Sequence, residues 1–190
     1  MFLHRVVLVI PMAKGDRYIL SRRAKDKHPF PDSWCCGVGG KVHSGEALEE
    51  AAIREMREEM GVEHPVREVV SFMYDKQDYK AIFTVFTTKD VLNPGDLKLD
   101  PREIQYSEAV SLGEILESVE KNPKIFSPTF IAAIREFARM RKRERPNHFS
   151  LPLWWKRAKY EIRAATNPML IVKDITLLWN PESRNSNPDT

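Results

Sequence analysis

Three glutamates stand at helical spacing within one segment of this 190-residue chain. Glu55 and Glu59 are four residues apart and Glu58 is three residues from Glu55, so a helix places all three along one edge. Like-charged pairs at this spacing destabilise a helix by roughly 0.2–0.5 kcal/mol each. A divalent cation such as Mg²⁺, which binds carboxylates together with substrate phosphates, removes that repulsion. The spacing therefore predicts a metal site that holds a phosphate, with a solvated acidic face neutralised by Arg54 and Arg57 as the alternative.

The helix that carries these glutamates is expected over residues 45–61. Ser44 or Gly45 is the expected N-cap, and Gly61 is the expected end because glycine adopts a left-handed conformation without steric cost. One apolar arc should face a core, and it is formed by Leu48, Ala52, Ile53, Met56 and Met60. A glycine-rich loop precedes the helix, and in it Gly40 lets the backbone approach a metal or a phosphate closely.

The whole segment resembles the Nudix box, a pattern of glycine, glutamate and an Arg-Glu-apolar-x-Glu-Glu-x-Gly-apolar run at fixed spacing. Every defined position is filled, by Gly40, Glu46, Arg54, Glu55, Met56, Glu58, Glu59, Gly61 and Val62. The resemblance covers roughly residues 1–140 and implies an α/β protein with the Nudix fold, an α/β/α sandwich around a mixed central sheet. It also implies a Mg²⁺- or Mn²⁺-dependent hydrolase that cleaves the pyrophosphate linkage of a nucleoside diphosphate derivative, such as a nucleotide sugar or a nucleoside triphosphate.

The same resemblance implies roles for the acidic residues of the box. The metal ligands it indicates are Gly40, through its carbonyl, and the side chains of Glu55, Glu58 and Glu59. The metal then lowers the pKa of a bound water, which attacks phosphorus in line. Glu46 and Arg54 are expected to form a salt bridge that fixes the loop on the helix.

A fourth catalytic glutamate is expected outside the box. Glu103 resembles the late glutamate of many Nudix proteins, which lies in a loop facing the box and serves as metal ligand or general base. Either Glu55 or Glu103 is expected to take the proton. A tryptophan is common where Ala109 stands in this chain, and a solvent-exposed loop residue is the alternative for Glu103.

Three cationic residues are predicted to bind substrate phosphate. Arg22 and Arg23 end a predicted strand near the cleft, where a guanidinium can clamp a phosphate through two hydrogen bonds. Because neighbouring strand residues point to opposite faces, at most one of these two arginines should do so. Lys41 directly follows Gly40 and is the third expected phosphate contact.

Two other functions remain open from the sequence. The run at residues 30–34, with Arg22 and Arg23 upstream, resembles isopentenyl diphosphate isomerases, which share the Nudix fold. Such an isomerase would carry a cysteine near Gly39 and a metal-binding histidine at Lys41, and would break the box at two of its glutamates, so the resemblance points to isomerase-like Nudix hydrolases. A non-catalytic Nudix-fold protein that binds nucleotides for regulation is the other alternative.

Composition and cysteine content indicate a cytoplasmic protein. Cys35 and Cys36 are adjacent, and neighbouring cysteines rarely bridge each other, so reduced thiols are expected rather than a disulfide or a zinc site. His4 and Arg5 interrupt any apolar run at the start, so no signal peptide is expected. There is no stretch of eighteen apolar residues to span a membrane.

The expected elements divide the chain into a Nudix domain at residues 1–145 and an extension at residues 146–190. Strands are expected at 2–13, 17–22, 35–38, 66–74, 79–88 and 103–110, and helices at 112–120 and 128–143, the last capped by Ser127. Residues 141–190 hold ten Lys and Arg against five Asp and Glu, and three of the four tryptophans. We expect the extension to pack on its own domain or form a homodimer, whereas an RNA or membrane-surface contact is the weaker hypothesis. Its last ten or so residues are expected to be disordered.

Overall fold

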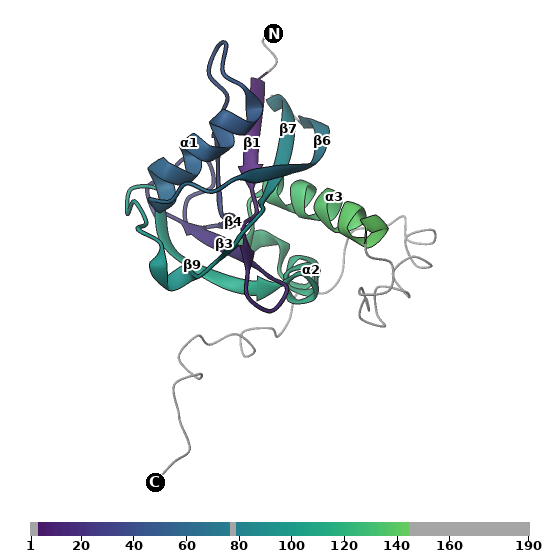
Figure 1. Ribbon diagram of the computed structural model, residues 1–190. Helices are drawn as coiled ribbons and strands as arrows, with labels where there is room; N and C mark the ends of the chain where they lie inside the picture. Colours follow the sequence, from purple (N-terminus) through teal and green to yellow (C-terminus); the bar gives the residue numbers. More distant parts are fainter. Residues whose placement is uncertain (1–3, 77–78, 145–190) are drawn as a thin grey trace. The chain divides into compact units, whose positions relative to one another are not determined.

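The computed structural model describes residues 4–76 and 79–144, which form strands and helices (Figure 1). The first half contains β1 (His4–Val9), β2 (Met12–Ala13), β3 (Arg17–Arg23), β4 (Trp34–Cys36), β5 (Val38–Lys41) and α1 (Leu48–Met60). The second half contains β6 (Val66–Lys76), β7 (Tyr79–Thr88), β8 (Val91–Leu92), β9 (Ile104–Ser111), α2 (Leu112–Lys121) and α3 (Pro128–Glu144). Two single 3₁₀ turns lie at Pro94–Asp96 and Pro123–Ile125.

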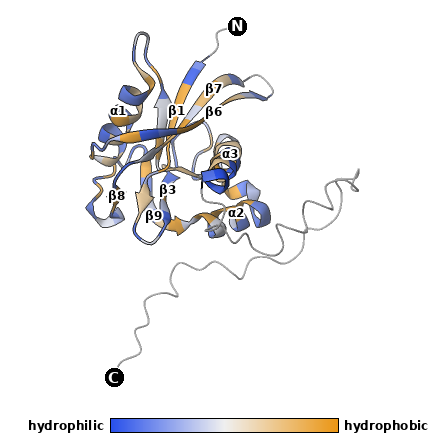
Figure 2. Ribbon diagram, turned by 45° about the vertical axis from the view of Figure 1, so that its right-hand side comes forward, coloured by the Kyte–Doolittle hydropathy of each residue, from blue (hydrophilic) through white to orange (hydrophobic). Residues whose placement is uncertain are grey.

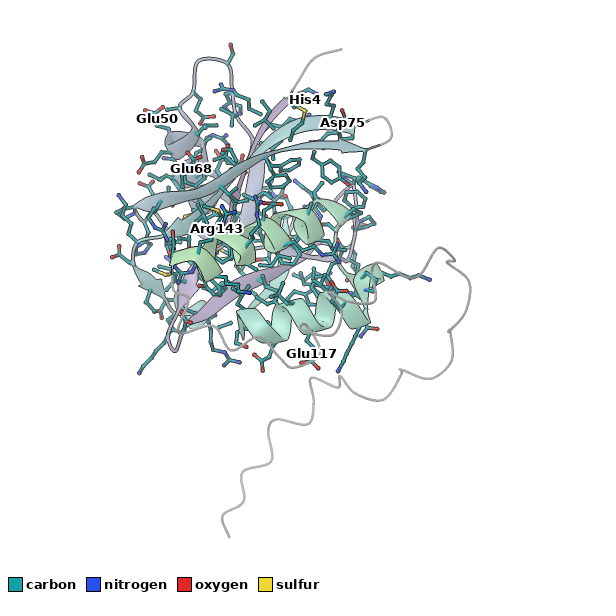
Figure 3. The ribbon with its side chains drawn as sticks, turned by 90° about the vertical axis from the view of Figure 1, so that its right-hand side faces the viewer. His4, Glu50, Glu68, Asp75, Glu117 and Arg143 are labelled. Atoms are coloured by element: carbon teal, nitrogen blue, oxygen red, sulfur yellow. The ribbon has the colours of Figure 1, made fainter. Side chains whose placement is uncertain are left out.

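The first sheet has the strand order β5-β1-β7-β6. It is mixed, because β1 runs parallel to β7, whereas β5 is antiparallel to β1 and β6 is antiparallel to β7. Helix α1 lies on one side of this sheet and α3 on the other. Figure 3 shows this layering from the side, with α2 and α3 in front of the strands and α1, marked by Glu50, behind them. The predicted α/β/α sandwich around a mixed sheet is therefore confirmed.

A second sheet is built around β3, which pairs with β2 and β4 along one edge and with β9 along the other. Strand β9 runs antiparallel to β3 from Arg17 opposite Ser111 to Arg23 opposite Ile104. This register places the start of β9, and with it Glu103, beside the end of β3. The second sheet thus carries one wall of the site described below.

A hydrophobic core lies between α1 and the strands. The buried residues of this core are Val7, Val9, Ala13, Ile19, Val38, Ala51, Ala52, Met56, Met60, Val66, Phe86, Leu92 and Ile104. Figure 2 shows hydrophobic stretches along the strands and an alternation of hydrophobic and hydrophilic residues along α1. The predicted apolar arc of this helix is confirmed, because Ala52, Met56 and Met60 are fully buried while Leu48 and Ile53 are partly buried against the same core.

Helix α3 is attached to the second sheet through an aromatic contact and a buried cation. The rings of Tyr18 and Phe137 meet edge to face with centroids 5.1 Å apart. Arg141 is buried, and its Nε donates a hydrogen bond of 2.9 Å to the Tyr18 hydroxyl. The predicted cap of this helix is confirmed, because the amide of Phe130 donates to the Ser127 hydroxyl at 3.3 Å.

The predicted element boundaries were wrong at three places. The single strand expected at residues 2–13 is two strands in different sheets, because Pro11 has no amide hydrogen to continue the ladder. The strand expected at 35–38 is also divided, with Gly37 between β4 and β5. Helix α1 begins at Leu48 and has Ala47 as its N-cap, whereas Ser44 and Gly45 belong to the preceding loop. The amide of Ala47 donates to the Glu50 carboxylate instead, at 3.2 Å.

The predicted extension at residues 146–190, with its homodimer, RNA and disorder hypotheses, lies outside the described residues. Among residues 4–76 and 79–144, none of the helices has the length and apolar character needed to cross a membrane.

Candidate active site

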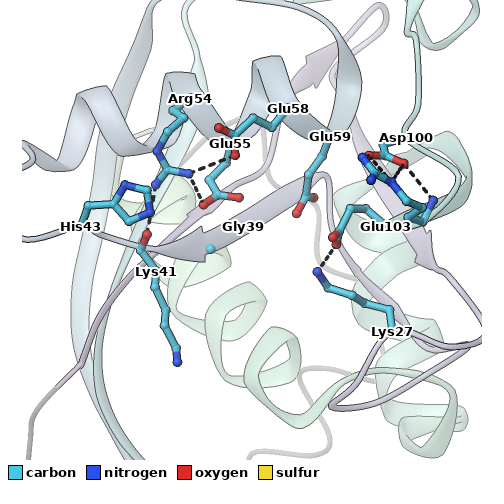
Figure 4. A pocket seen from close by; sticks show the side chains of 12 residues that line it. Lys27, Gly39, Lys41, His43, Arg54, Glu55, Glu58, Glu59, Asp100 and Glu103 are labelled. Carbon is cyan, nitrogen blue, oxygen red and sulfur yellow. Dashed lines mark hydrogen bonds and ion pairs between the residues drawn. The ribbon is translucent and has the colours of Figure 1, made fainter.

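A cleft of about 560 Å³ opens between the start of β9, the loop after β3, strand β5 and helix α1. Figure 4 shows this cleft with the carboxylates of Glu55, Glu59 and Glu103 directed toward the same open space. Its lining residues are Lys27, Gly39, Gly40, Lys41, His43, Arg54, Glu55, Glu58, Glu59, Asp100, Arg102 and Glu103. The four predicted catalytic glutamates, Gly40 and Lys41 therefore all line one cleft, although Glu103 is more than forty residues from the box in sequence.

Helix α1 sets the direction of its glutamates through the burial of its apolar arc. Because Met56 and Met60 fix one side of the helix in the core, Glu55 and Glu59 lie at the boundary between the core and the cleft. Glu55 is only 8% exposed, whereas the side chain of Glu58 is 53% exposed. The helix ends at Gly61, which has the left-handed φ of 66° expected of a C-terminal glycine.

Arg54 holds the loop before α1 against the helix. Its Nε and Nη2 donate to the two carboxylate oxygens of Glu46, at 2.8 and 3.1 Å, and Nη2 also donates to the Lys41 carbonyl at 3.0 Å. The pKa of Glu46 is lowered to about 2, chiefly by the hydrogen bonds from Arg54, with a contribution from the backbone of His43. The predicted salt bridge between Glu46 and Arg54 is thus present in the structure.

The remaining nitrogen of Arg54 contacts two of the predicted metal ligands. Its Nη1 donates to Glu55 at 2.7 Å and to Glu58 at 3.2 Å, as the dashed lines in Figure 4 mark. One guanidinium therefore joins the loop glutamate to two glutamates of the helix. These contacts partly offset the repulsion between Glu55 and Glu58.

Gly40 lies directly against the carboxylate of Glu55. A Cβ atom at position 40 would collide with both carboxylate oxygens of Glu55, so only glycine fits there with this glutamate in place. The requirement for glycine at this point of the box thus has a steric cause. It also places the backbone of β5 next to the carboxylates of α1.

The protonation of Glu59 is strongly affected by its surroundings. Burial, together with repulsion from Glu55 and Glu103, raises its pKa to about 9. Burial also raises the pKa of Glu55, and Arg54 offsets part of that increase. Negative charge in this cleft is thus unfavourable unless a cation neutralises it.

Glu103 forms an ion pair with Lys27, a residue that the sequence analysis did not identify. The amide of Ala24 donates to the carbonyl of Glu103 at 2.9 Å, and this pairing brings the loop after β3 to the start of β9. Lys27 lies in that loop, where no helical or strand periodicity indicates the direction of its side chain. Only the tertiary pairing of β3 with β9 places it in the cleft.

The two predicted arginines lie on opposite faces of β3, as strand alternation requires, and neither lines the cleft. The Arg22 guanidinium forms an ion pair with Asp32 at 3.1 Å and lies 5.8 Å from the centre of the Trp34 ring. Arg23 donates weakly to the Lys27 carbonyl at 3.4 Å, and its buried Nε has no partner among the described residues. Direct phosphate binding by one of them stays a prediction.

The residues of the cleft suit a divalent metal by their chemistry, but they are not arranged around one in advance. The donors are carboxylate oxygens beside a backbone carbonyl, the type that Mg²⁺ and Mn²⁺ prefer. In the part of the chain that the structure describes, no three His, Cys, Asp or Glu side chains are gathered closely enough to hold a metal ion. In this structure the side chains of Glu55 and Glu58 instead bond to Arg54.

Comparison with known proteins shows which family this chain resembles. A family model described as the NUDIX domain matches residues 2–130. An isopentenyl-diphosphate Δ-isomerase from Cereibacter sphaeroides is 28% identical over 137 residues, which cover 66% of this chain and 73% of that protein. The nucleoside triphosphatase NudI of Escherichia coli is 38% identical over 68 residues, covering 35% of this chain and 48% of that protein.

A solved structure shares the arrangement of the elements. The crystal structure of a MutT protein from Methanosarcina mazei Go1 aligns with a TM-score of 0.62 at 25% sequence identity. The alignment covers 74% of this chain and 96% of that one. The fold of the solved structure thus agrees with the family model that matches the sequence.

Proposed function

This chain belongs to the Nudix family, and we propose that it is a Mg²⁺- or Mn²⁺-dependent hydrolase of the pyrophosphate linkage in a nucleoside diphosphate derivative. One observation carries the proposal: all four predicted catalytic glutamates line a single cleft together with Gly40 and Arg54. A protein of this fold that only bound nucleotides would have no need for the complete set. The intact set therefore favours catalysis over a regulatory function.

In this proposal, Glu55, Glu58 and Glu59 hold the metal together with the Gly40 carbonyl. Glu58 is exposed enough to turn toward the cleft, and Gly40 keeps the backbone close to Glu55. A divalent metal bound there would supply Lewis acidity, stabilising charge on the phosphate oxygens and acidifying water. Arg54 keeps Glu46 and the loop in place when its bonds with Glu55 and Glu58 are released.

Glu103 or Glu55 accepts the proton of the attacking water. Both line the cleft, and each lies close enough to Glu59 to affect its pKa. Glu103 comes from the second sheet, so it faces the box from the opposite wall. Lys27 holds its carboxylate in position and adds a positive charge beside the substrate.

The substrate class follows from the relatives and from the cations of the cleft. NudI is named a nucleoside triphosphatase, which supports a substrate with a phosphate anhydride. Lys27 and Lys41 both line the cleft and suit phosphate oxygens. The isomerase relative covers more of the chain, but position 41 is lysine, which does not replace a metal-binding histidine while it is protonated. We therefore place hydrolysis ahead of isomerisation.

A panel of nucleoside triphosphates, nucleoside diphosphate sugars and isopentenyl diphosphate, each with Mg²⁺ or Mn²⁺, tests the proposal. We expect hydrolysis of at least one nucleotide, seen as phosphate or pyrophosphate from a triphosphate, or as a nucleoside monophosphate and a sugar phosphate from a nucleoside diphosphate sugar. In the Glu58→Gln variant, we expect turnover to fall by roughly 10²–10³-fold, with the circular dichroism spectrum unchanged because this side chain is largely exposed. Full activity in that variant would show that Glu58 is not one of the metal ligands. Isomerisation of isopentenyl diphosphate without phosphate release would support the other enzyme class.

A further inference from the structure

The ion pair between Lys27 and Glu103 joins two segments of the chain that are far apart in sequence. Figure 4 shows this ion pair beside Glu59 in the cleft. The side chains of Lys27 and Glu103 are 33% and 26% exposed. An ion pair that water reaches contributes little stability, because solvent screens the attraction and two long side chains must be ordered. Other contacts must therefore hold the two segments so that these charges meet.

Lys27 lies in the loop between β3 and β4, residues 24–33, and hydrogen bonds within this loop give it a defined shape. The amides of Lys27 and Asp32 both donate to the Ala24 carbonyl, at 3.1 and 3.3 Å. Phe30 and Asp32 have left-handed φ angles of 62° and 53°, which residues other than glycine rarely adopt unless their surroundings impose them. The orientation of the loop relative to β9 therefore decides where the Lys27 ammonium lies.

Gln105 is the extra residue of a β-bulge at the start of β9. The ladder between β3 and β9 pairs Arg22 with Tyr106 and Arg23 with Ile104, so Gln105 is left out of the pairing. Bulges are common next to active sites, where they redirect a side chain. In this protein the side chain at the bulge bonds to the loop after β3.

The amide group of the Gln105 side chain contacts both ends of this loop. Its Nε2 donates to the Arg23 carbonyl at 2.6 Å and to Oδ1 of Asp32 at 2.7 Å. Asp32 is held in turn by Arg22, whose Nε donates to the same oxygen at 3.1 Å. One side chain of β9 thus fixes the residue before the loop and a residue near its end.

The loop is therefore bonded to β9 at residues on both sides of Ile104. On one side, the amide of Ala24 donates to the Glu103 carbonyl at 2.9 Å, and on the other, Gln105 makes its two bonds. A single hydrogen bond would act as a hinge, whereas contacts on both sides fix the angle between the loop and the strand. Removing the Gln105 amide group frees the loop to turn and to carry Lys27 away from Glu103.

We propose that Gln105 is a positioning residue, which acts by holding Lys27 beside the carboxylate of Glu103. The inference rests on the proposed hydrolase function, in which Glu103 faces the metal ligands and is a candidate proton acceptor. Gln105 does not itself line the cleft, so it acts through Lys27 and not by touching the substrate. Without its two bonds, Lys27 no longer orients Glu103, and displacing a catalytic group by about 1 Å can lower a rate by as much as ~10²-fold.

Limited acetylation of the full-length protein with acetic anhydride, followed by mass spectrometry of its peptides, tests this positioning without any turnover. An amine held by a carboxylate reacts slowly, because the carboxylate favours its protonated form. Gln105→Met removes both hydrogen bonds and keeps most of the length of the side chain. We expect Lys27 in this variant to react about threefold faster than in wild type, relative to Lys14 in the same sample. An unchanged relative rate for Lys27 would contradict the proposal.

Steady-state kinetics test whether this positioning matters for hydrolysis. We expect Gln105→Met to lower kcat by roughly tenfold and to change KM by less than about twofold, because Gln105 is outside the cleft. In a Lys27→Met background, the same change should alter kcat by less than about twofold, because the residue that it positions is gone. Losses that multiply in the double variant would overturn a role through Lys27.

Arg135→Met is the matched control, because it removes a hydrogen bond of 2.8 Å that joins α3 to Glu120 of α2. We expect this variant to keep the wild-type kcat and the wild-type acetylation rate of Lys27. An equal change in the two variants would show a general loss of rigidity and overturn the assignment of Gln105. If the wild-type protein hydrolyses no substrate of the panel, the proposed function fails, whereas the acetylation rates still decide whether Gln105 positions Lys27.

Discussion

The guanidinium of Arg54 bonds to both carboxylate oxygens of Glu46, at 2.8 and 3.1 Å, and joins the loop before α1 to the helix. The two residues are eight apart in sequence, and the helix begins between them. A contact of this kind fixes the position of the backbone at Lys41 and Gly40 as well, because Arg54 also bonds to the Lys41 carbonyl. We therefore expect a change at this salt bridge to affect both the stability and the activity of the protein.

Replacing Glu46 by Gln should lower both stability and activity. The charge-assisted bonds to Arg54 become neutral ones, so we expect the free energy of unfolding to fall by about 1–3 kcal/mol, measured by urea denaturation. We also expect weaker Mg²⁺ binding, because Arg54 then bonds more strongly to Glu55 and Glu58. Glu49→Gln, on the exposed side of the first helical turn, is the control, and an equal loss in that variant would show a general effect of charge at the start of the helix.

Gly40→Ala should remove activity through a single methyl group. The added Cβ would collide with the Glu55 carboxylate, so that side chain must leave its position next to β5. We expect kcat to fall by roughly a hundredfold or more, in the range seen when one group that stabilises the transition state is displaced, in steady-state assays with Mg²⁺. Gly113→Ala is the matched control, because a Cβ there meets no atom within 4 Å. Wild-type kcat for Gly40→Ala would show that Glu55 is free to relocate.

Mg²⁺ should stabilise the protein against heat, and a chelator should reverse the effect. The cation neutralises carboxylates that burial and mutual repulsion disfavour, and it binds only the folded chain. At ten times its Kd the stabilisation is about 1.4 kcal/mol, which scanning calorimetry detects as a higher Tm. Glu58→Gln should show a smaller rise than wild type. An equal rise in the two proteins would place the stabilising metal elsewhere.

Asp32 should contribute stability that is lost in acid. Hydrogen bonds from Arg22 and Gln105 lower its pKa from 3.8 to about 2. Because the folded pKa is below the unfolded one, this contribution is fully present above pH 3.8 and disappears as the pH falls through about 2. Denaturation at a series of pH values should show a shallower loss of stability in Asp32→Asn than in wild type over that window. Asp26→Asn, in the same loop, should keep the wild-type slope, and identical slopes in all three proteins would contradict the assignment.

The sequence predicted the box and the sandwich well because both depend on local spacing. The apolar arc of α1 and the stop at Gly61 follow from helical periodicity, and the structure contains both. The salt bridge between Glu46 and Arg54 follows from the family pattern. The side chains of this helix are thus placed correctly from sequence alone, although its N-cap was not.

What the sequence did not predict depends on pairing between distant segments. Lys27 reaches the cleft because the loop after β3 bonds to the carbonyl of Glu103, a contact across about eighty residues. The expected strands at 2–13 and 35–38 are divided at Pro11 and Gly37, and each division depends on which sheet each half joins. Arg22 and Arg23 were predicted near the cleft, with at most one binding phosphate, yet neither lines it, and Arg22 instead forms an ion pair with Asp32 and lies against the Trp34 ring. Hydrophobic patterns within one segment contain no information on such partners.

The chain passes between the two sheets at Pro11 and again at Gly37, and these two crossings are stacked on each other. A Cβ at position 37 would be 2.5 Å from the Cδ of Pro11, so the crossings touch with no room for a side chain. This contact joins the sheet that packs against α1, which carries Glu59, to the sheet whose strand β9 follows Glu103. We therefore expect a side chain added at position 37 to change the distance between the two walls of the cleft. Reshaping the enzyme for a larger substrate can thus begin far from its chemistry, at a residue whose contribution is the absence of a side chain.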